Sequence, residues 1–111
     1  MRMQFNGDRL SRFESVARLR DLLFGLEKDL GIGSLTPNEL DILYAMRLLS
    51  DGDGQVVRSD AIRDHSLCSK IPRPTFHRSL RSLIEKGLVE RAPKTRARAY
   101  VLASTELRPG N

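Results

Sequence analysis

The sequence predicts a mainly α-helical chain with a small β-hairpin near its C-terminal end, an α+β fold. Two observations support this class. Apolar residues recur at spacings of three and four along most of the chain up to residue 86, and the period changes to two near residue 88. The chain has 111 residues, 40% of them hydrophobic and 30% charged, which fits one small domain with a modest core and argues against wholesale disorder.

A long helix is predicted from Arg9 to Leu30, stopped by the glycines that follow it. Its apolar stripe holds Phe13, Val16, Ala17, Leu23, Phe24 and Leu30, and it is widened by Leu10, Leu19, Leu22 and Leu26. This surface is wider than one small core needs, so we expect it to face a partner. We predict a homodimer through this helix, with packing on its own domain as the alternative. The predicted interface holds Phe13, Val16, Leu19, Leu23, Phe24 and Leu26.

The next helix has a sharp start signal in Thr36-Pro37-Asn38-Glu39. This segment fits a capping box, in which Thr36 and Glu39 bond to each other's backbone amides, with proline at the first helical position. The apolar residues that follow lie nearly all round the helix, which predicts burial on several sides. The turn residues Asp51–Gly54 end the helix.

Shorter elements follow. Gln55–Val57 suits at most a minor strand, and Ser59 is expected to cap a helix from Asp60 to Ser66 with Ala61 and Ile62 facing inward. Prolines open a further helix, 74–86, whose inner stripe holds Phe76, Leu80, Leu83 and Ile84. Two strands, 88–92 and 98–102, are joined by a short tip and form the hairpin.

This order of elements is that of a winged helix–turn–helix with an added long N-terminal helix. The predicted domains are 1–33 for the N-terminal helix and 34–102 for the winged helix–turn–helix, with a loose tail over 103–111.

Positive charge gathers in the second half of the chain. Residues 1–54 hold seven basic and nine acidic residues, whereas residues 55–111 hold twelve basic and five acidic ones. Most of the excess lies between Lys70 and Arg98. A basic half of this kind favours a polyanionic partner, most often nucleic acid, although a solvated surface is the simpler alternative.

The basic residues coincide with the two elements that a winged helix presents to DNA. One helix must enter the major groove with a polar, basic side outward, and 74–86 meets that demand. Its predicted DNA contacts are Arg73, Thr75, His77, Arg78, Ser79, Arg81 and Ser82. The hairpin adds Arg91, Lys94, Arg96 and Arg98, which we expect to attract phosphates.

Two segments carry a resemblance to a known family. Leu35–Leu43 resembles the first winged-domain helix of MarR-like transcription regulators, and Arg73–Arg91 resembles their recognition helix with its Leu-x-x-x-Gly-Leu-Val-x-Arg entry into the wing. The resemblance covers about residues 35–102. It implies that Thr75, Arg78, Ser79 and Arg81 face bases or phosphates and that Arg96 and Arg98 serve the wing. Those regulators flank the winged domain with helices on both sides, whereas 103–111 shows no helical pattern.

Other classes of site receive little support from the sequence. Cys68, His65 and His77 lack the paired spacing of a zinc site, so we predict no metal and no cofactor, and a structural thiol at Cys68 with redox sensing as the alternative. No nucleophile–base pair or phosphate loop appears, so we predict no enzymatic activity. The absence of an apolar leader or membrane span predicts a cytoplasmic chain with no membrane partner.

The predicted function is sequence-specific binding of double-stranded DNA in prokaryotic transcription regulation. Two alternatives remain open at this level: a winged-helix module that binds another protein without DNA, and binding of RNA or nucleic-acid ends. Neither the operator nor a small-molecule effector follows from the sequence.

Overall fold

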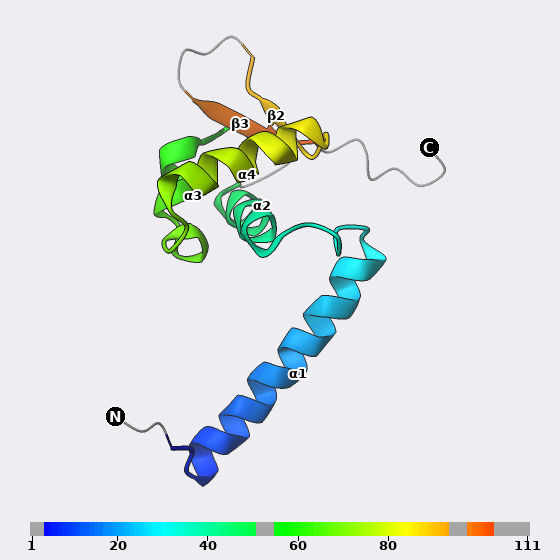
Figure 1. Cartoon of the computed structure of the whole chain (residues 1–111), viewed down its shortest axis with the longest axis vertical. Coiled ribbons are helices and arrows are strands. Elements are labelled where there is room, and N and C mark those ends of the chain that lie inside the picture. Colours follow the sequence, from blue (N-terminus) through cyan, green and yellow to red (C-terminus); the bar gives the residue numbers. More distant parts are fainter. Residues whose placement is uncertain (1–3, 51–54, 94–97, 104–111) are drawn as a thin grey trace. The chain divides into compact units, whose positions relative to one another are not determined.

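The computed structural model describes residues 4–50, 55–93 and 98–103. The chain divides into two compact units, Met1–Leu35 and Thr36–Asn111, which are described separately below as unit 1 and unit 2. The described residues are mainly helical with a small antiparallel sheet, which agrees with the predicted α+β class (Figure 1).

Unit 1 contains the helix α1 (Gly7–Asp29), which starts two residues before the predicted one and ends one residue before it. The Asn6 side chain caps its first turn by accepting a 2.8 Å hydrogen bond from the Arg9 amide. None of the residues of α1 is buried. The six residues of the predicted dimer interface are all exposed, Phe24 to 65% and Leu23 to 38%.

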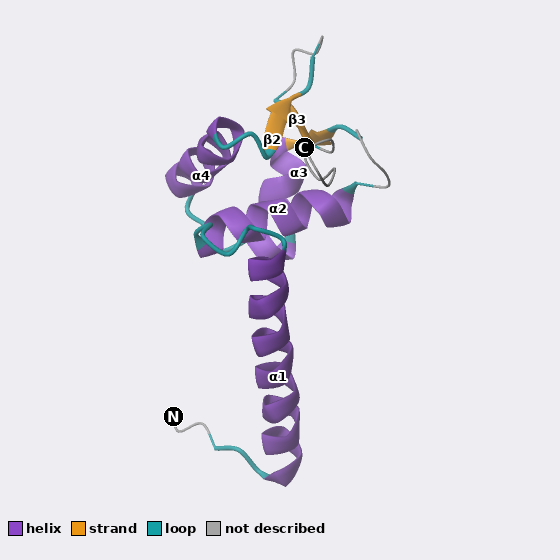
Figure 2. Ribbon diagram, turned by 90° about the vertical axis from the view of Figure 1, so that its right-hand side faces the viewer, coloured by secondary structure: helices purple, strands orange, loops and turns teal. Residues whose placement is uncertain are grey.

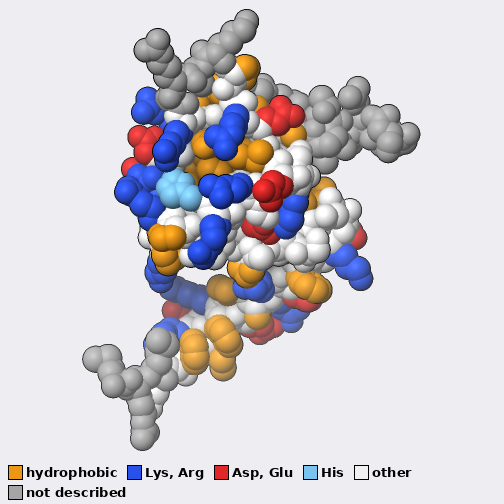
Figure 3. Space-filling view, turned by 45° about the horizontal axis from the view of Figure 1, so that its top comes forward, with side chains coloured by type: hydrophobic (Ala, Val, Ile, Leu, Met, Phe, Trp, Pro, Cys, Tyr) orange, Lys and Arg blue, Asp and Glu red, His pale blue; other side chains and the backbone are white. Residues whose placement is uncertain are grey.

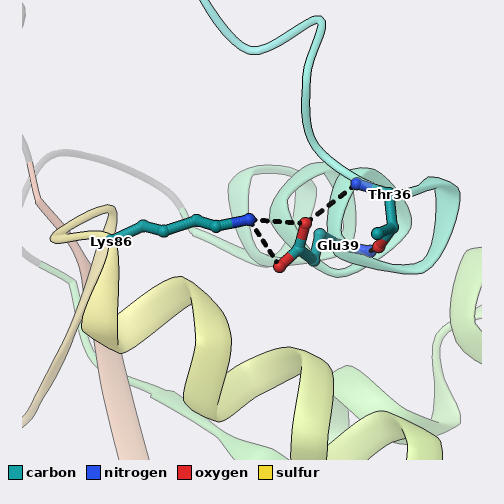
Figure 4. Close-up of polar contacts among 3 residues, drawn as sticks. All are labelled: Thr36, Glu39 and Lys86. Carbon is teal, nitrogen blue, oxygen red and sulfur yellow. Dashed lines mark hydrogen bonds and ion pairs between the residues drawn. The ribbon is translucent and has the colours of Figure 1, made fainter.

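Unit 2 begins with the helix α2 (Pro37–Leu49), and its predicted capping box is confirmed. The Thr36 hydroxyl accepts from the Glu39 amide at 3.1 Å, while the Glu39 carboxylate accepts from the Thr36 amide at 2.8 Å (Figure 4). Ile42, Ala45 and Met46 are completely buried, as the apolar surround of this helix predicts, although Leu48 is exposed.

Within the described residues of unit 2, α2 is followed by the helix α3 (Ser59–Asp64), the 3-10 turn η1 (Ser66–Cys68) and the helix α4 (Arg73–Glu85). Figure 2 shows α2 lying across this unit below α3 and the strands, and α2 packs against α3, η1 and α4. Buried side chains from all of these elements and from the sheet form one core, made of Ile42, Ala45, Met46, Val57, Ile62, Cys68, Phe76, Leu80, Leu83, Val89, Ala92, Ala99 and Tyr100.

The sheet has three strands, β1 (Val57–Arg58), β2 (Val89–Arg91) and β3 (Ala99–Leu102), in the order β1-β3-β2. Both pairings are antiparallel. The predicted hairpin strands are confirmed with slightly narrower bounds. The minor strand predicted over Gln55–Val57 is observed at Val57–Arg58, and it forms an edge of the sheet because both residues pair with β3.

The short helix differs from its prediction. Ser59 is its buried first residue rather than its cap, Arg58 stands at the N-cap without a side-chain bond, and Ala61 is exposed. The helix ends before the predicted Ser66, because His65 is extended and its ring Nδ1 accepts from the Leu67 amide at 3.1 Å. This bond favours a turn over continued α-helix.

A buried carboxylate joins the start of α2 to the end of α4. Glu39 is only 3% exposed, and Lys86 Nζ contacts its two carboxylate oxygens at 3.1 and 3.0 Å (Figure 4). Burial raises the pKa of Glu39, but hydrogen bonds from Ser82, the Thr36 amide and Lys86 outweigh it and lower the pKa to about 2. The ionised form is therefore favoured by folding, and it fixes the contact between α2 and α4.

This contact makes folding stability depend on pH. A depressed pKa stabilises the folded state above pH 4.5, and that contribution is lost as the pH falls from 4.5 towards 2. We predict that Glu39→Gln lowers the free energy of unfolding by about 2 kcal/mol at pH 7, and that this deficit shrinks steadily below pH 4.5. Denaturant titrations at a series of pH values measure the free energy of unfolding of the wild-type protein and of the variant. The control Glu85→Gln, at an exposed acid on α4, should show no such trend, and a deficit for Glu39→Gln that stays constant down to pH 2 would contradict the assignment.

Candidate nucleic-acid interface

The rotation of α4 about its axis decides which residues face solvent. Three of the four predicted inward residues, Phe76, Leu80 and Leu83, are at most 2% exposed. The fourth, Ile84, is half-buried. The opposite side of the helix exposes Arg78, Arg81 and Glu85, Arg73 is exposed at the first position of the helix, and His77 is half-buried.

Two serines predicted on the outward face do not lie there. Ser79 is buried, and Ser82 is half-buried and hydrogen-bonded to Glu39. The prediction is wrong because α2 packs against this flank of α4, and its carboxylate at Glu39 draws Ser82 inward. Thr75 is half-buried on the same flank, and its hydroxyl accepts from Arg78 Nη2 at 3.2 Å.

A hollow of about 230 Å³ lies between α4 and the strands β2 and β3, along the flank of the helix where its buried stripe meets its exposed side. Several basic side chains and a histidine lie beside an apolar patch on this face of the molecule, with acidic side chains at the far border of the patch, as Figure 3 shows. The helix contributes His77, Leu80, Arg81 and Ile84 to the lining, and the strand side contributes Arg91, Arg98 and Tyr100.

The register of the sheet explains why two arginines reach this hollow. Arg91 lies directly opposite Tyr100 in the β2–β3 pair, and residues opposite each other in an antiparallel pair point to the same face. Arg98 precedes Tyr100 by two positions, which gives it the same face again. Hence Arg91, Arg98 and Tyr100 share one side of the sheet.

The causes of the pKa shift of His77 show that several cations lie near this side chain. Burial lowers the pKa of His77 first, and the charges of Arg98, Arg63, Arg73 and Arg81 lower it further. Arg63 belongs to α3, and sequence reasoning did not single it out because a lone arginine on a short helix carries no pattern. Four cations from three segments thus act on one imidazole, an arrangement that attracts anions.

The predicted site residues are therefore only partly brought together. His77, Arg81, Arg91 and Arg98 line the hollow, and Arg73 lies close enough to act on His77. Arg78 is exposed but does not line the hollow. The predictions for Lys94 and Arg96 lie outside the described residues.

The other candidate chemistry of the sequence is not assembled. Cys68 is buried and its Sγ donates to the Asp41 carbonyl at 3.6 Å. Burial, followed by the charge of Asp41, raises the pKa of this thiol to about 11, so it is protonated near neutral pH and a poor nucleophile.

Over residues 4–50, 55–93 and 98–103, no three His, Cys, Asp or Glu side chains form a group able to hold a metal ion. Within the same part of the chain, no helix has the length and apolar character needed to cross a membrane.

Comparison of the chain with protein-family models, curated proteins and solved structures found no significant match. The function proposed below therefore rests on the residues and geometry of this chain.

The cation cluster predicts a measurable titration. We expect His77 to titrate below its ordinary pKa of 6.5, and Arg98→Gln to raise that pKa because it removes the foremost of the neighbouring charges. Imidazole proton shifts followed by NMR over pH 4–9 measure both. The chain has only two histidines, which makes assignment simple.

Arg47→Gln is the matched control, since Arg47 is exposed on α2 and is not among the charges that act on His77. It should leave the titration of His77 unchanged. A His77 that titrates at or above 6.5, or that responds equally to both substitutions, would mean that the arginines do not converge on it.

Proposed function

We propose that unit 2 is a winged helix–turn–helix domain that binds double-stranded DNA sequence-specifically, and that the protein regulates transcription in a prokaryote. The observation that carries this proposal is the hollow between α4 and the sheet, which Arg81, Arg91 and Arg98 line with no acidic residue among its lining, while the charges of Arg63 and Arg73 also act on His77. Unpaired cations on a stable framework are expected where a polyanion binds.

The helix α4 suits the major groove of DNA. Its 13 residues begin at Arg73, and its exposed side presents arginines in the first and middle turns and an acid only in the last. A groove about 12 Å wide admits one such helix, and arginine reads guanine with two hydrogen bonds. Arg78 is the best candidate for a base contact, because it is exposed, lies away from the hollow and is oriented by Thr75.

The β2–β3 pair suits the sugar–phosphate backbone beside that groove. Arg91 on β2 and Arg98 directly before β3 are exposed beside strands that pack against the core, and their positive charge acts on any sequence equally. This division of roles assigns base reading to α4 and sequence-independent attraction to the strand side.

The division of roles predicts different effects on cognate and unrelated DNA. Arg78→Ala should weaken binding to a preferred sequence by about 1–3 kcal/mol and leave binding to unrelated duplexes nearly unchanged. The preferred sequence comes from selection out of random duplexes, and fluorescence anisotropy measures the affinities. Arg47→Ala, which removes one exposed arginine from α2, should affect neither.

The same titrations on duplex RNA and heparin distinguish the alternatives. The deep, narrow major groove of A-form RNA does not admit a helix, so the proposal expects weaker binding to duplex RNA than to DNA. Stronger binding to RNA would favour RNA recognition instead. A wild-type protein with no salt-dependent affinity for any of the three would favour the protein-binding module.

We also propose that the protein is a homodimer through α1. Ten large apolar side chains from Phe5 to Leu30 are exposed, and an isolated helix of 23 residues gains little stability of its own in water. The partner is a second copy because α1 is charge-balanced, with five basic and five acidic residues, so that two copies do not repel. A twofold dimer matches a pseudo-palindromic operator.

Charged substitutions on the apolar side should separate the dimer. Leu19→Glu with Leu26→Glu places two carboxylates on one stripe of α1, and we expect the protein to become monomeric at micromolar concentration. Analytical ultracentrifugation measures the mass. Ser11→Glu adds an acid on the side of α1 away from Val16 and Leu23 and should leave the dimer intact, whereas a wild-type protein that is already monomeric at 100 μM would refute the dimer.

A further inference from the structure

Three cations of the hollow have no counter-ion of their own. Arg81, Arg91 and Arg98 are exposed and converge from three segments, yet within the described residues none of them pairs with a carboxylate. Cations gathered in this way repel one another, and an anion placed between them relieves that repulsion. The hollow is therefore best filled by one compact negative charge.

The floor of the hollow adds a second requirement. Leu80, Ile84 and Tyr100 supply an apolar surface between the arginines. The volume of about 230 Å³ is smaller than the roughly 300–1,000 Å³ of sites that enclose drug-sized molecules. The chemistry that fits is a single phosphate joined to a small, largely apolar ring, which is the repeating unit of a nucleic-acid strand.

We infer that the hollow seats one sugar–phosphate unit of DNA, its phosphate shared by the three arginines and its sugar lying on the apolar floor. The inference rests on the proposed function, since a helix in the major groove and strands beside that groove are separated by one sugar–phosphate backbone. The hollow lies between those two elements. Because the hollow holds one particular sugar–phosphate unit of the DNA backbone, it fixes the position of α4 along the major groove.

Sharing one phosphate has a signature in the salt dependence of binding. Each phosphate contact contributes about 0.9 to the slope of log K against log salt. When one of three arginines is removed, the other two still neutralise the phosphate and the slope is retained. When all three are removed, the slope falls by the value of one contact only.

The experiment compares Arg81→Gln, Arg91→Gln, Arg98→Gln and the triple variant. Binding to the selected duplex is measured by anisotropy between 50 and 300 mM salt, with circular dichroism confirming that the exposed substitutions leave the fold intact. We expect each single variant to lose about tenfold in affinity with the slope unchanged, and the triple variant to lose about 0.9 in slope. Arg47→Gln controls for net charge and should change neither quantity.

Two outcomes would overturn the inference and still leave the proposed function supported, provided that the wild-type protein binds the selected duplex. A slope that falls by about 0.9 for each arginine means that the three grip separate phosphates. A triple variant with the wild-type slope means that the hollow lies outside the interface. A wild-type protein that binds no duplex at low salt would instead overturn the proposed function together with this inference.

Discussion

The rotation of α4 about its own axis is the constraint on which the rest of unit 2 depends. The ring of Phe76 is completely buried, and removing such a ring from a core usually costs about 3–5 kcal/mol. The Glu39–Lys86 pair holds the C-terminal end of α4 to the start of α2. A helix fixed along its buried stripe and at one end cannot turn, so Arg73, His77, Arg78 and Arg81 are held outward together. Truncating Phe76 should therefore disturb the presentation of the basic side as well as stability.

The basic side itself works against folding. Several guanidiniums held near a half-buried imidazole repel each other, and the described residues offer them no acid in the hollow. A fold that evolved for stability alone would intersperse acids among these arginines. The repulsion becomes useful when a polyanion replaces the missing acids, because like charges that cost energy in the free protein then each gain a partner. Exposure to solvent keeps this cost small in the free state.

Local signals allowed most of the fold to be predicted from the sequence. The capping box at Thr36 depends only on residues that are neighbours along the chain, and it is present in full. The inward stripe of Phe76, Leu80 and Leu83 follows from helical spacing alone. The edge of that stripe does not follow from helical spacing, since it depends on which flank of α4 meets α2. For that reason the sequence predicts Ser79 and Ser82 on the exposed face wrongly, whereas Arg78 and Arg81 beside them are exposed as predicted.

The hollow could not be predicted from the sequence, for a related reason. It needs the register that sets Arg91 opposite Tyr100, and it needs the sheet to lie beside the flank of α4 that carries His77, Leu80, Arg81 and Ile84. Both are long-range relations between segments that carry no local signal. The predicted strand over 98–102 places Arg98 and Tyr100 on one face by its period of two, but only the pairing of β2 with β3 adds Arg91 to that face.

The measurement that tests the central claim most directly is a map of backbone amide shifts in the protein saturated with duplex DNA. We predict perturbations along α4 from Arg73 to Arg81 and at Arg91, Arg98 and Tyr100, with Tyr44 and Leu48 on α2 unaffected. Perturbations confined to α1 or α2, with those of α4 absent, would contradict it.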